Sequence, residues 1–293
     1  MLRFLLFAIL FFHGASALAQ GGPSPETVKG NAPPLERDLS RFKLPPQTKS
    51  LLAKGLDLLD KTEYYQAIAL FEKAHQQSPQ SPVPAFLMGL AYGQLRQPTN
   101  AAVQFNRALK LQPDFEEAVF ARGLVRLENN KPSRAMEDFE EVLKINPQHA
   151  GAAYYRGFDH YEHGRYQEAL TDFNASLKSA PENSTTLCWR GFALRKLGKP
   201  REAITDFDAS LKLDALEPQT WVGRGLAKRE CGDEEGAQKD FQRAIEIDPN
   251  YANLGVISPT AQGLRGFLIY GLFALVFFFG VAAFYLLKPI LKK

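Results

Sequence analysis

The sequence predicts an all-α protein, in which six helical hairpins form a solenoid and one transmembrane helix follows near the C-terminus. Three observations support this. A glycine recurs every 34 residues, and an alanine and a phenylalanine follow each glycine at fixed offsets. An apolar stretch without charged residues lies close to the C-terminus and is long enough to cross a bilayer.

The first residues have the pattern of a secretory signal. Arg3 precedes the apolar stretch 4–12, and the segment ends in Ala17-Leu18-Ala19. A charged start, a short apolar centre and an Ala-x-Ala end predict a signal peptide over residues 1–19. The alternative is an uncleaved signal anchor, which the short centre disfavours because a membrane span needs roughly 20 apolar residues.

Residues 20–47 form a linker rich in proline and glycine, a composition typical of flexible segments. Near its end, Leu35, Leu39 and Phe42 have helical spacing. We expect them to cover the exposed face of the first hairpin. Pro45 and Pro46 limit the length of this helix.

The region 48–251 consists of six units of 34 residues. Each unit has a glycine, an alanine twelve residues later and a phenylalanine four residues after that. The glycines are Gly55, Gly89, Gly123, Gly157, Gly191 and Gly225; the alanines are Ala67, Ala101, Ala135, Ala169, Ala203 and Ala237; the phenylalanines are Phe71, Phe105, Phe139, Phe173, Phe207 and Phe241. The units span 48–81, 82–115, 116–149, 150–183, 184–217 and 218–251. All but the fifth, which has Ala215, close with a proline.

This pattern resembles the tetratricopeptide repeat (TPR), and the resemblance covers about 70 percent of the chain. The sixth unit shows the family positions as Trp221, Gly225, Ala237, Phe241, Ala244 and Pro249. The resemblance implies a right-handed superhelical solenoid of antiparallel helix pairs. Small residues let the two helices of a unit approach closely, the phenylalanine fills the space between them, and stacking buries the remaining apolar face. Breakers such as Gly164, Gly198 and Gly232 are expected between the two helices.

Units three to six carry a further pair of residues that the first two units lack. An arginine stands directly before the glycine and an aspartate directly before the phenylalanine, sixteen residues later. The pairs are Arg122 and Asp138, Arg156 and Asp172, Arg190 and Asp206, and Arg224 and Asp240. Because both members appear and disappear together, we predict an ion pair that ties the first helix of each unit to the second.

After a linker at 252–265, residues 266–287 contain no charged side chain and are predicted to form a transmembrane helix. The basic tail 288–293 carries three lysines, whereas Arg265 is the single cation at the other end of the stretch. The positive-inside rule therefore puts the tail in the cytoplasm and the repeats in the periplasm, an organelle lumen or the exterior. The inverted topology, with cytoplasmic repeats and a tail anchor, remains the alternative if the N-terminal stretch is not a signal.

Charge and motifs limit the functional classes. Five of the 35 basic residues lie in the two apolar ends, which leaves 30 basic against 32 acidic residues between them. This balance argues against nucleic-acid binding, which needs a clustered cationic surface. His160 and His163 stand three residues apart, but the metalloprotease pattern His-Glu-x-x-His is absent, as are nucleotide-binding and nucleophile-elbow motifs. We therefore expect no enzyme activity, no cofactor and no metal. The two cysteines, Cys188 and Cys231, can form at most one internal disulfide.

The resemblance also implies where a partner would bind. In this family the first helices line a concave surface that usually receives a peptide. The corresponding groove residues are Phe86, Leu90, Phe120, Leu124, Tyr154, Phe158, Tyr161, Phe192, Arg195 and Arg229. Alternatively, much of this aromatic stripe serves as packing between successive first helices.

The sequence thus predicts a membrane-anchored scaffold that binds another protein through a peptide or helix. The alternative function is an architectural subunit of a membrane assembly, which would use an uncapped sixth unit and the transmembrane helix. Either reading is compatible with homo-oligomers.

Overall fold

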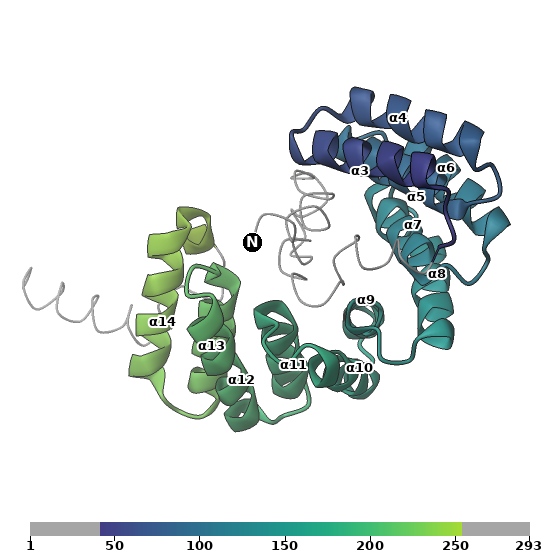
Figure 1. Cartoon of the computed structure of the whole chain (residues 1–293). Helices are drawn as coiled ribbons and strands as arrows, with labels where there is room; N and C mark the ends of the chain where they lie inside the picture. Colours follow the sequence, from purple (N-terminus) through teal and green to yellow (C-terminus); the bar gives the residue numbers. More distant parts are fainter. Residues whose placement is uncertain (1–41, 254–293) are drawn as a thin grey trace, which may run out of the picture.

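The computed structural model describes residues 42–253, and within that range the chain is entirely helical. Twelve α-helices stack as six antiparallel pairs along an arc, and a short 3₁₀-helix follows (Figure 1). The helices are α3 (Pro46–Asp60), α4 (Tyr64–Gln77), α5 (Pro82–Gln94), α6 (Pro98–Leu111), α7 (Glu116–Glu128), α8 (Pro132–Ile145), α9 (Ala150–Glu162), α10 (Tyr166–Ser179), α11 (Ser184–Lys196), α12 (Pro200–Leu213), α13 (Pro218–Glu230), α14 (Glu234–Ile247) and η5 (Pro249–Asn253). The six predicted hairpins are confirmed.

The turn between the two helices of each unit depends on one residue with positive φ. Gly164, Gly198 and Gly232 occupy this position in the last three units, as predicted, with φ of 75°, 73° and 86°. Glycine adopts this conformation without a steric penalty. The first three units use Thr62, Arg96 and Asn130 at the same place in the repeat. The sequence pattern could not reveal this equivalence, because only the glycines signal a turn by residue type.

The repeated glycines let the phenylalanines lie against the backbone of the first helix. A Cβ added at Gly123 would lie 2.7 Å from Cε1 of Phe139, closer than carbon atoms pack. The glycines of the other five units face their own phenylalanines in the same way. All six phenylalanines and all six repeated alanines are buried. The predicted contact at the centre of each hairpin is therefore present in every unit.

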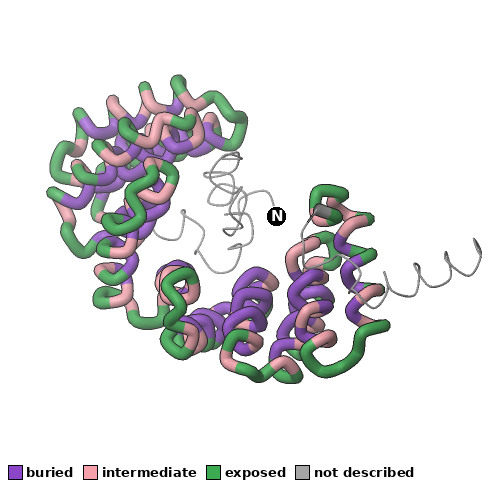
Figure 2. Tube along the Cα trace, turned by 180° about the vertical axis from the view of Figure 1, so that it is seen from behind, coloured by how far each residue is buried: buried purple, intermediate pink, exposed green. Residues whose placement is uncertain are grey.

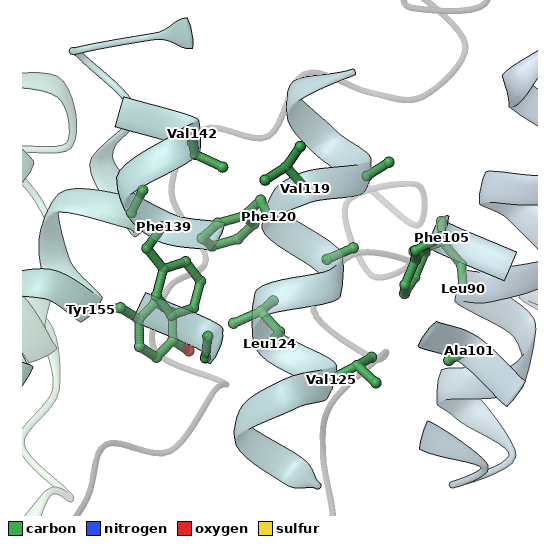
Figure 3. Close-up of a cluster of buried hydrophobic side chains, with 14 of the residues drawn as sticks. Leu90, Ala101, Phe105, Val119, Phe120, Leu124, Val125, Phe139, Val142 and Tyr155 are labelled. Carbon is green, nitrogen blue, oxygen red and sulfur yellow. The ribbon is translucent and has the colours of Figure 1, made fainter. Parts of the chain in front are cut away.

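Each unit also needs its neighbour. The ring of Phe139 on α8 stacks on Tyr155 of α9 at 4.8 Å, and Phe120 of α7 lies 5.6 Å from the same Phe139 ring (Figure 3). Aromatic and aliphatic side chains continue this way through one core that extends from the first unit to Ala227 of the sixth, where Val222, Ala237, Phe241 and Ala244 form a second cluster. Figure 2 shows the buried residues gathered where helices face each other, and the exposed ones at the turns and on outward faces.

The predicted ion pairs form in all four units that carry them. Arg122 Nη2 lies 2.6 Å from Asp138 Oδ1, and Nε of the same arginine donates a second hydrogen bond to that carboxylate. The aspartates are buried, so the pairs lie at the helix interface rather than on the surface. Several of the arginines also reach the preceding unit, where Asn106, Asn174 and Asp208 accept hydrogen bonds from Arg122, Arg190 and Arg224. The pair therefore links successive units as well as the two helices of one unit.

The sixth unit is more polar on its outer side than the others. Gln238 stands where the five earlier units have apolar residues that pack on the core, namely Ile68, Ala102, Met136, Leu170 and Ile204. In addition, Tyr251 of η5 and Ile245 of α14 pack against the buried cluster that contains Phe241.

No helix among residues 42–253 is long and apolar enough to cross a membrane. The predicted signal at 1–19, most of the linker 20–47 and the transmembrane segment 266–287 lie outside the described residues.

The ion pairs allow a matched mutational test on one arginine. Asp138 is 1% exposed and Glu141, at 3.4 Å from the same Arg122, is 45% exposed. We expect Asp138→Ala to lower the free energy of unfolding by about 3 to 5 kcal/mol, because Arg122 and also Arg126, at 2.7 Å from the same carboxylate, then lose their buried partner. Glu141→Ala should cost less than about 0.5 kcal/mol, as exposed pairs do. Urea denaturation measures both values, and equal effects would refute the buried clamp.

Candidate protein-binding surface

Six of the ten predicted groove residues are buried in the array. They contact neighbouring helices rather than an open surface: the Phe86 ring lies 4.9 Å from Phe115, and the Phe192 ring meets Phe207 edge-on at 5.1 Å. A bound peptide would find little of these side chains to touch. The six are Phe86, Leu90, Phe120, Leu124, Tyr154 and Phe192. For them the structure shows packing between successive helices, the reading that the sequence left open.

The other four predicted residues, Phe158, Tyr161, Arg195 and Arg229, are partly exposed. Phe158 and Tyr161 of α9 both meet the indole of Trp189 on α11, with ring centroids 4.7 and 5.3 Å apart. Trp189 itself is 6% exposed, so it forms the floor beneath the other two rings. Because this tryptophan lies outside the groove positions of the family, position-based reasoning missed it.

Arg195 lies at the edge of this aromatic group. Its Nη1 donates a hydrogen bond of 2.9 Å to Glu230 Oε1 on α13, and its side chain is 14% exposed. Its Nε is buried and has no hydrogen-bond partner among the described residues. We call Phe158, Tyr161, Trp189 and Arg195 the α9–α11 patch. Two apolar rings, one indole floor and one cation lie together there on two successive first helices, α9 and α11.

Burial controls the protonation of the phenol in this patch. The low-polarity surroundings raise the pKa of Tyr161 to about 12, although the Arg195 guanidinium opposes that shift. The hydroxyl is therefore neutral at physiological pH. It can donate or accept one hydrogen bond at the rim of an apolar surface. Arg229 of α13 places its guanidinium 5.5 Å from the Phe241 ring.

In three units the residue that precedes the first helix caps it, a role that the sequence reading overlooked. His149 Nδ1 accepts a hydrogen bond of 3.0 Å from the Ala152 amide at the start of α9. Asn183, the equivalent residue of the next unit, accepts one of 2.7 Å from the Thr186 amide, and Ser81 caps α5. The signal was present, because these three residues stand at one repeat position and two of them are common caps.

The environment of His149 favours its neutral form. Its ring lies 4.5 Å from the Phe120 ring. Burial lowers its pKa to about 4, although the nearby Glu117 carboxylate acts in the opposite direction. An Nδ1 that accepts the Ala152 amide also cannot carry a proton. The cap of α9 is therefore intact only while this histidine is unprotonated.

His160, which the sequence suggested as a metal-ligand candidate, has structural partners instead. His160 Nε2 lies 3.6 Å from Asp172 Oδ2, and Arg165 donates to its other ring nitrogen. Among residues 42–253, no three His, Cys, Asp or Glu side chains are arranged to hold a metal ion. Cys188 and Cys231 are both free, and burial raises the pKa of the Cys188 thiol to about 12.

The family is decided by comparison with known repeats. A tetratricopeptide repeat model matches residues 86–150, 120–184 and 190–252, more than half of the chain. The chain belongs to the tetratricopeptide repeat family. Members of this family generally bind other proteins or peptides, so the fold indicates a protein-interaction scaffold. A search of curated protein sequences found no match.

Solved structures with the same fold are distant in sequence. PilF of Pseudomonas aeruginosa is 15% identical with a TM-score of 0.62, and the match covers 69% of this chain and 92% of that one. PilW, described as a type IV pilus biogenesis factor, is 17% identical with a TM-score of 0.58, over 73% and 97% of the two chains. YrrB, described as a TPR protein with an unusual peptide-binding site, is 18% identical with a TM-score of 0.55, over 64% and 95%. At these identities the likeness shows the fold alone.

The His149 cap predicts a specific pH dependence. The unfolded chain binds a proton near pH 6.5, whereas the folded chain resists it until about pH 4. The stability that this histidine contributes is therefore complete above pH 6.5 and is lost as the pH falls toward 4, by about 2 to 3 kcal/mol in total. His149→Asn keeps a capping acceptor, as at Asn183, and removes the titration. The difference between wild type and variant in unfolding free energy should grow in that pH window; a constant difference would contradict the assignment.

Proposed function

We propose that this protein is a membrane-anchored scaffold that binds a partner protein at the α9–α11 patch. The observation that carries the proposal is the clustering of partly exposed Phe158 and Tyr161 over Trp189, with Arg195 beside them. Aromatic residues and arginine dominate the energetics of protein interfaces, because they bury large areas with little conformational entropy lost. The helical array holds them in fixed positions, which lowers the entropic cost of binding further.

The composition of the patch defines the partner's chemistry. Phe158 and Tyr161 offer apolar area to an apolar side chain of the partner. Beside them, Arg195 is already paired with Glu230, so a partner carboxylate or carbonyl would compete with that pair or add to it. A neutral Tyr161 hydroxyl supplies one further hydrogen bond without a charge to desolvate. We infer a partner segment with an apolar anchor and a nearby acceptor group.

Site-specific photocrosslinking in native membranes tests the proposal. A photoreactive phenylalanine analogue at Phe158 should yield a discrete crosslinked partner. The same analogue at Val103, which is 57% exposed on α6 of the second unit, is the control for nonspecific contact and should not yield it.

A second variant separates binding from folding. Tyr161→Ala combined with Arg195→Ala removes the hydroxyl and the cation from the patch, and should abolish the crosslink at 158 while the protein still melts cooperatively. An unchanged crosslink in this variant, or identical products from positions 158 and 103, would refute the patch as the binding site.

We further propose that the scaffold is exported and anchored. The signal pattern at 1–19, the uncharged stretch 266–287 and the lysines of the tail 288–293 support this, because they agree on one orientation. The repeats would then face the periplasm, a lumen or the exterior, and the tail the cytoplasm. Protein partners would be recruited at the non-cytoplasmic surface of the membrane.

The two cysteines provide a topology test. Cys231 is exposed and Cys188 is buried, so the folded repeats offer one reactive thiol. A membrane-impermeant maleimide should label intact cells, or inside-out vesicles if the compartment is an organelle lumen, from the non-cytoplasmic side. Cys231→Ser should abolish the labelling. Labelling that appears only from the cytoplasmic side would support the inverted topology instead.

A further inference from the structure

Two adjacent units carry opposite charges at the same repeat positions. The turn between α11 and α12, residues 195–201, holds four basic side chains and no acidic one. The equivalent residues 229–235, between α13 and α14, hold four acidic side chains and one basic side chain. In each of the four earlier units, the same seven positions have a net charge between −1 and +1 with histidine neutral. We call residues 195–201 the basic turn and residues 229–235 the acidic turn.

Most of these charges are exposed to solvent. Lys196 and Arg201 are exposed, and no ion pair joins either of them to another residue among 42–253. Lys199 lies 3.6 Å from Glu202, and its side chain is still 49% exposed. Glu235 is 82% exposed although it pairs with a lysine one turn further along α14. Surface ion pairs of this kind are weak, so both turns can still attract a partner of opposite charge.

The two turns lie side by side in the last two units of the arc (Figure 1). Arg195 Nη1 at the end of α11 donates its hydrogen bond of 2.9 Å to Glu230 Oε1 at the end of α13. The axes of packed helices are about 10 Å apart. A second copy that is rotated by 180° about an axis between the turns brings each basic turn opposite an acidic turn. The surface formed by the two turns is therefore complementary to itself.

We propose that two copies of this chain associate through the basic and acidic turns as a twofold-symmetric dimer. The contact between opposite charges then occurs twice, and turns of like charge lie diagonally across the axis. A second copy fits this surface better than an acidic or a basic partner of another kind, because such a partner would be attracted to one turn and repelled by its neighbour. The inference depends neither on partner binding at the α9–α11 patch nor on membrane anchoring.

Sedimentation equilibrium of the full-length protein in density-matched detergent tests the proposal. We expect a monomer–dimer equilibrium whose dissociation constant rises about tenfold between roughly 0.05 M and 0.5 M salt, because salt screens exposed charges. A protein that stays monomeric at low salt would overturn the proposal, and so would a dimer whose affinity does not change with salt.

Charge reversal tests which surfaces meet. Changing Lys196, Lys199 and Arg201 to glutamate leaves the basic turn with one cation and three anions. Changing Glu234 and Glu235 to lysine leaves the acidic turn with three cations and two anions. Each variant alone should be monomeric, because turns of like charge then face each other at both contacts. An equimolar mixture of the two variants should regain the dimer, since both contacts of a mixed pair again join opposite charges. A mixture that stays monomeric would contradict the proposed arrangement.

A matched control separates this effect from net charge. Changing Lys110, Lys131 and Arg134 to glutamate reverses three exposed cations in units two and three, and should leave the dimer unchanged. All three variants should melt cooperatively, because the substituted side chains are exposed. An equal loss of dimer in the control would overturn the proposal. A chain that dimerises as described but captures no partner at position 158 would retain this inference and lose the proposed function.

Discussion

The close approach of the two helices of each hairpin, glycine backbone against phenylalanine ring, is the constraint on which the rest of the structure depends. Because Gly123 has no side chain, Phe139 can lie flat against α7 and remain fully buried. The other side of the Phe139 ring then stacks on Tyr155 of the next unit. One contact thus fixes both the geometry of the hairpin and the way in which hairpins stack, and the same contact recurs in all six units.

This dependence on neighbours explains why so few of the predicted groove residues are available for binding. A hairpin cannot bury its own apolar face, so the rings on the first helices serve as packing between units. Phe120 and Phe192 illustrate this, since the Phe120 ring lies 6.2 Å from Tyr155 of the next unit and Phe192 packs against Gly223 of the next unit. Surface for a partner remains only where an aromatic ring is not fully buried by the neighbouring helices. The indole of Trp189, from the next unit, packs beneath Phe158 and Tyr161, and these two rings stay partly exposed.

The arginine–aspartate pairs add polar connections to the same architecture. Asp138 contacts Arg122 and also Arg126, one turn further along α7. Burial raises the pKa of this carboxyl, and the two arginines oppose the shift. Where Asn106, Asn174 and Asp208 accept from the arginine of the following unit, the pair becomes part of the stacking. The first two units lack it and use Met88 or Leu70 at the corresponding places.

Sequence periodicity predicted the features that recur in every unit, because a repeated contact imposes a repeated residue. The hairpins and the glycine–phenylalanine contacts are of this kind, and the ion pairs recur in the same way in units three to six. Features that occur only once in the chain could not be predicted from sequence periodicity. Whether Phe86 or Phe158 is exposed depends on the side chains of the next unit, and Trp189 occurs in the fifth unit alone. The path of Phe42 to Phe115 joins residues 73 positions apart, for which no period exists.

A direct test of this account is an NMR measurement of the contact between each repeated glycine and its phenylalanine in the isotope-labelled protein. The account predicts nuclear Overhauser effects between the Hα protons of Gly123 and the ring protons of Phe139, and between the equivalent atoms of the other five units, with glycine Hα resonances shifted upfield by the rings. Absence of these effects in the central units, where neighbours stack on both sides, would contradict it.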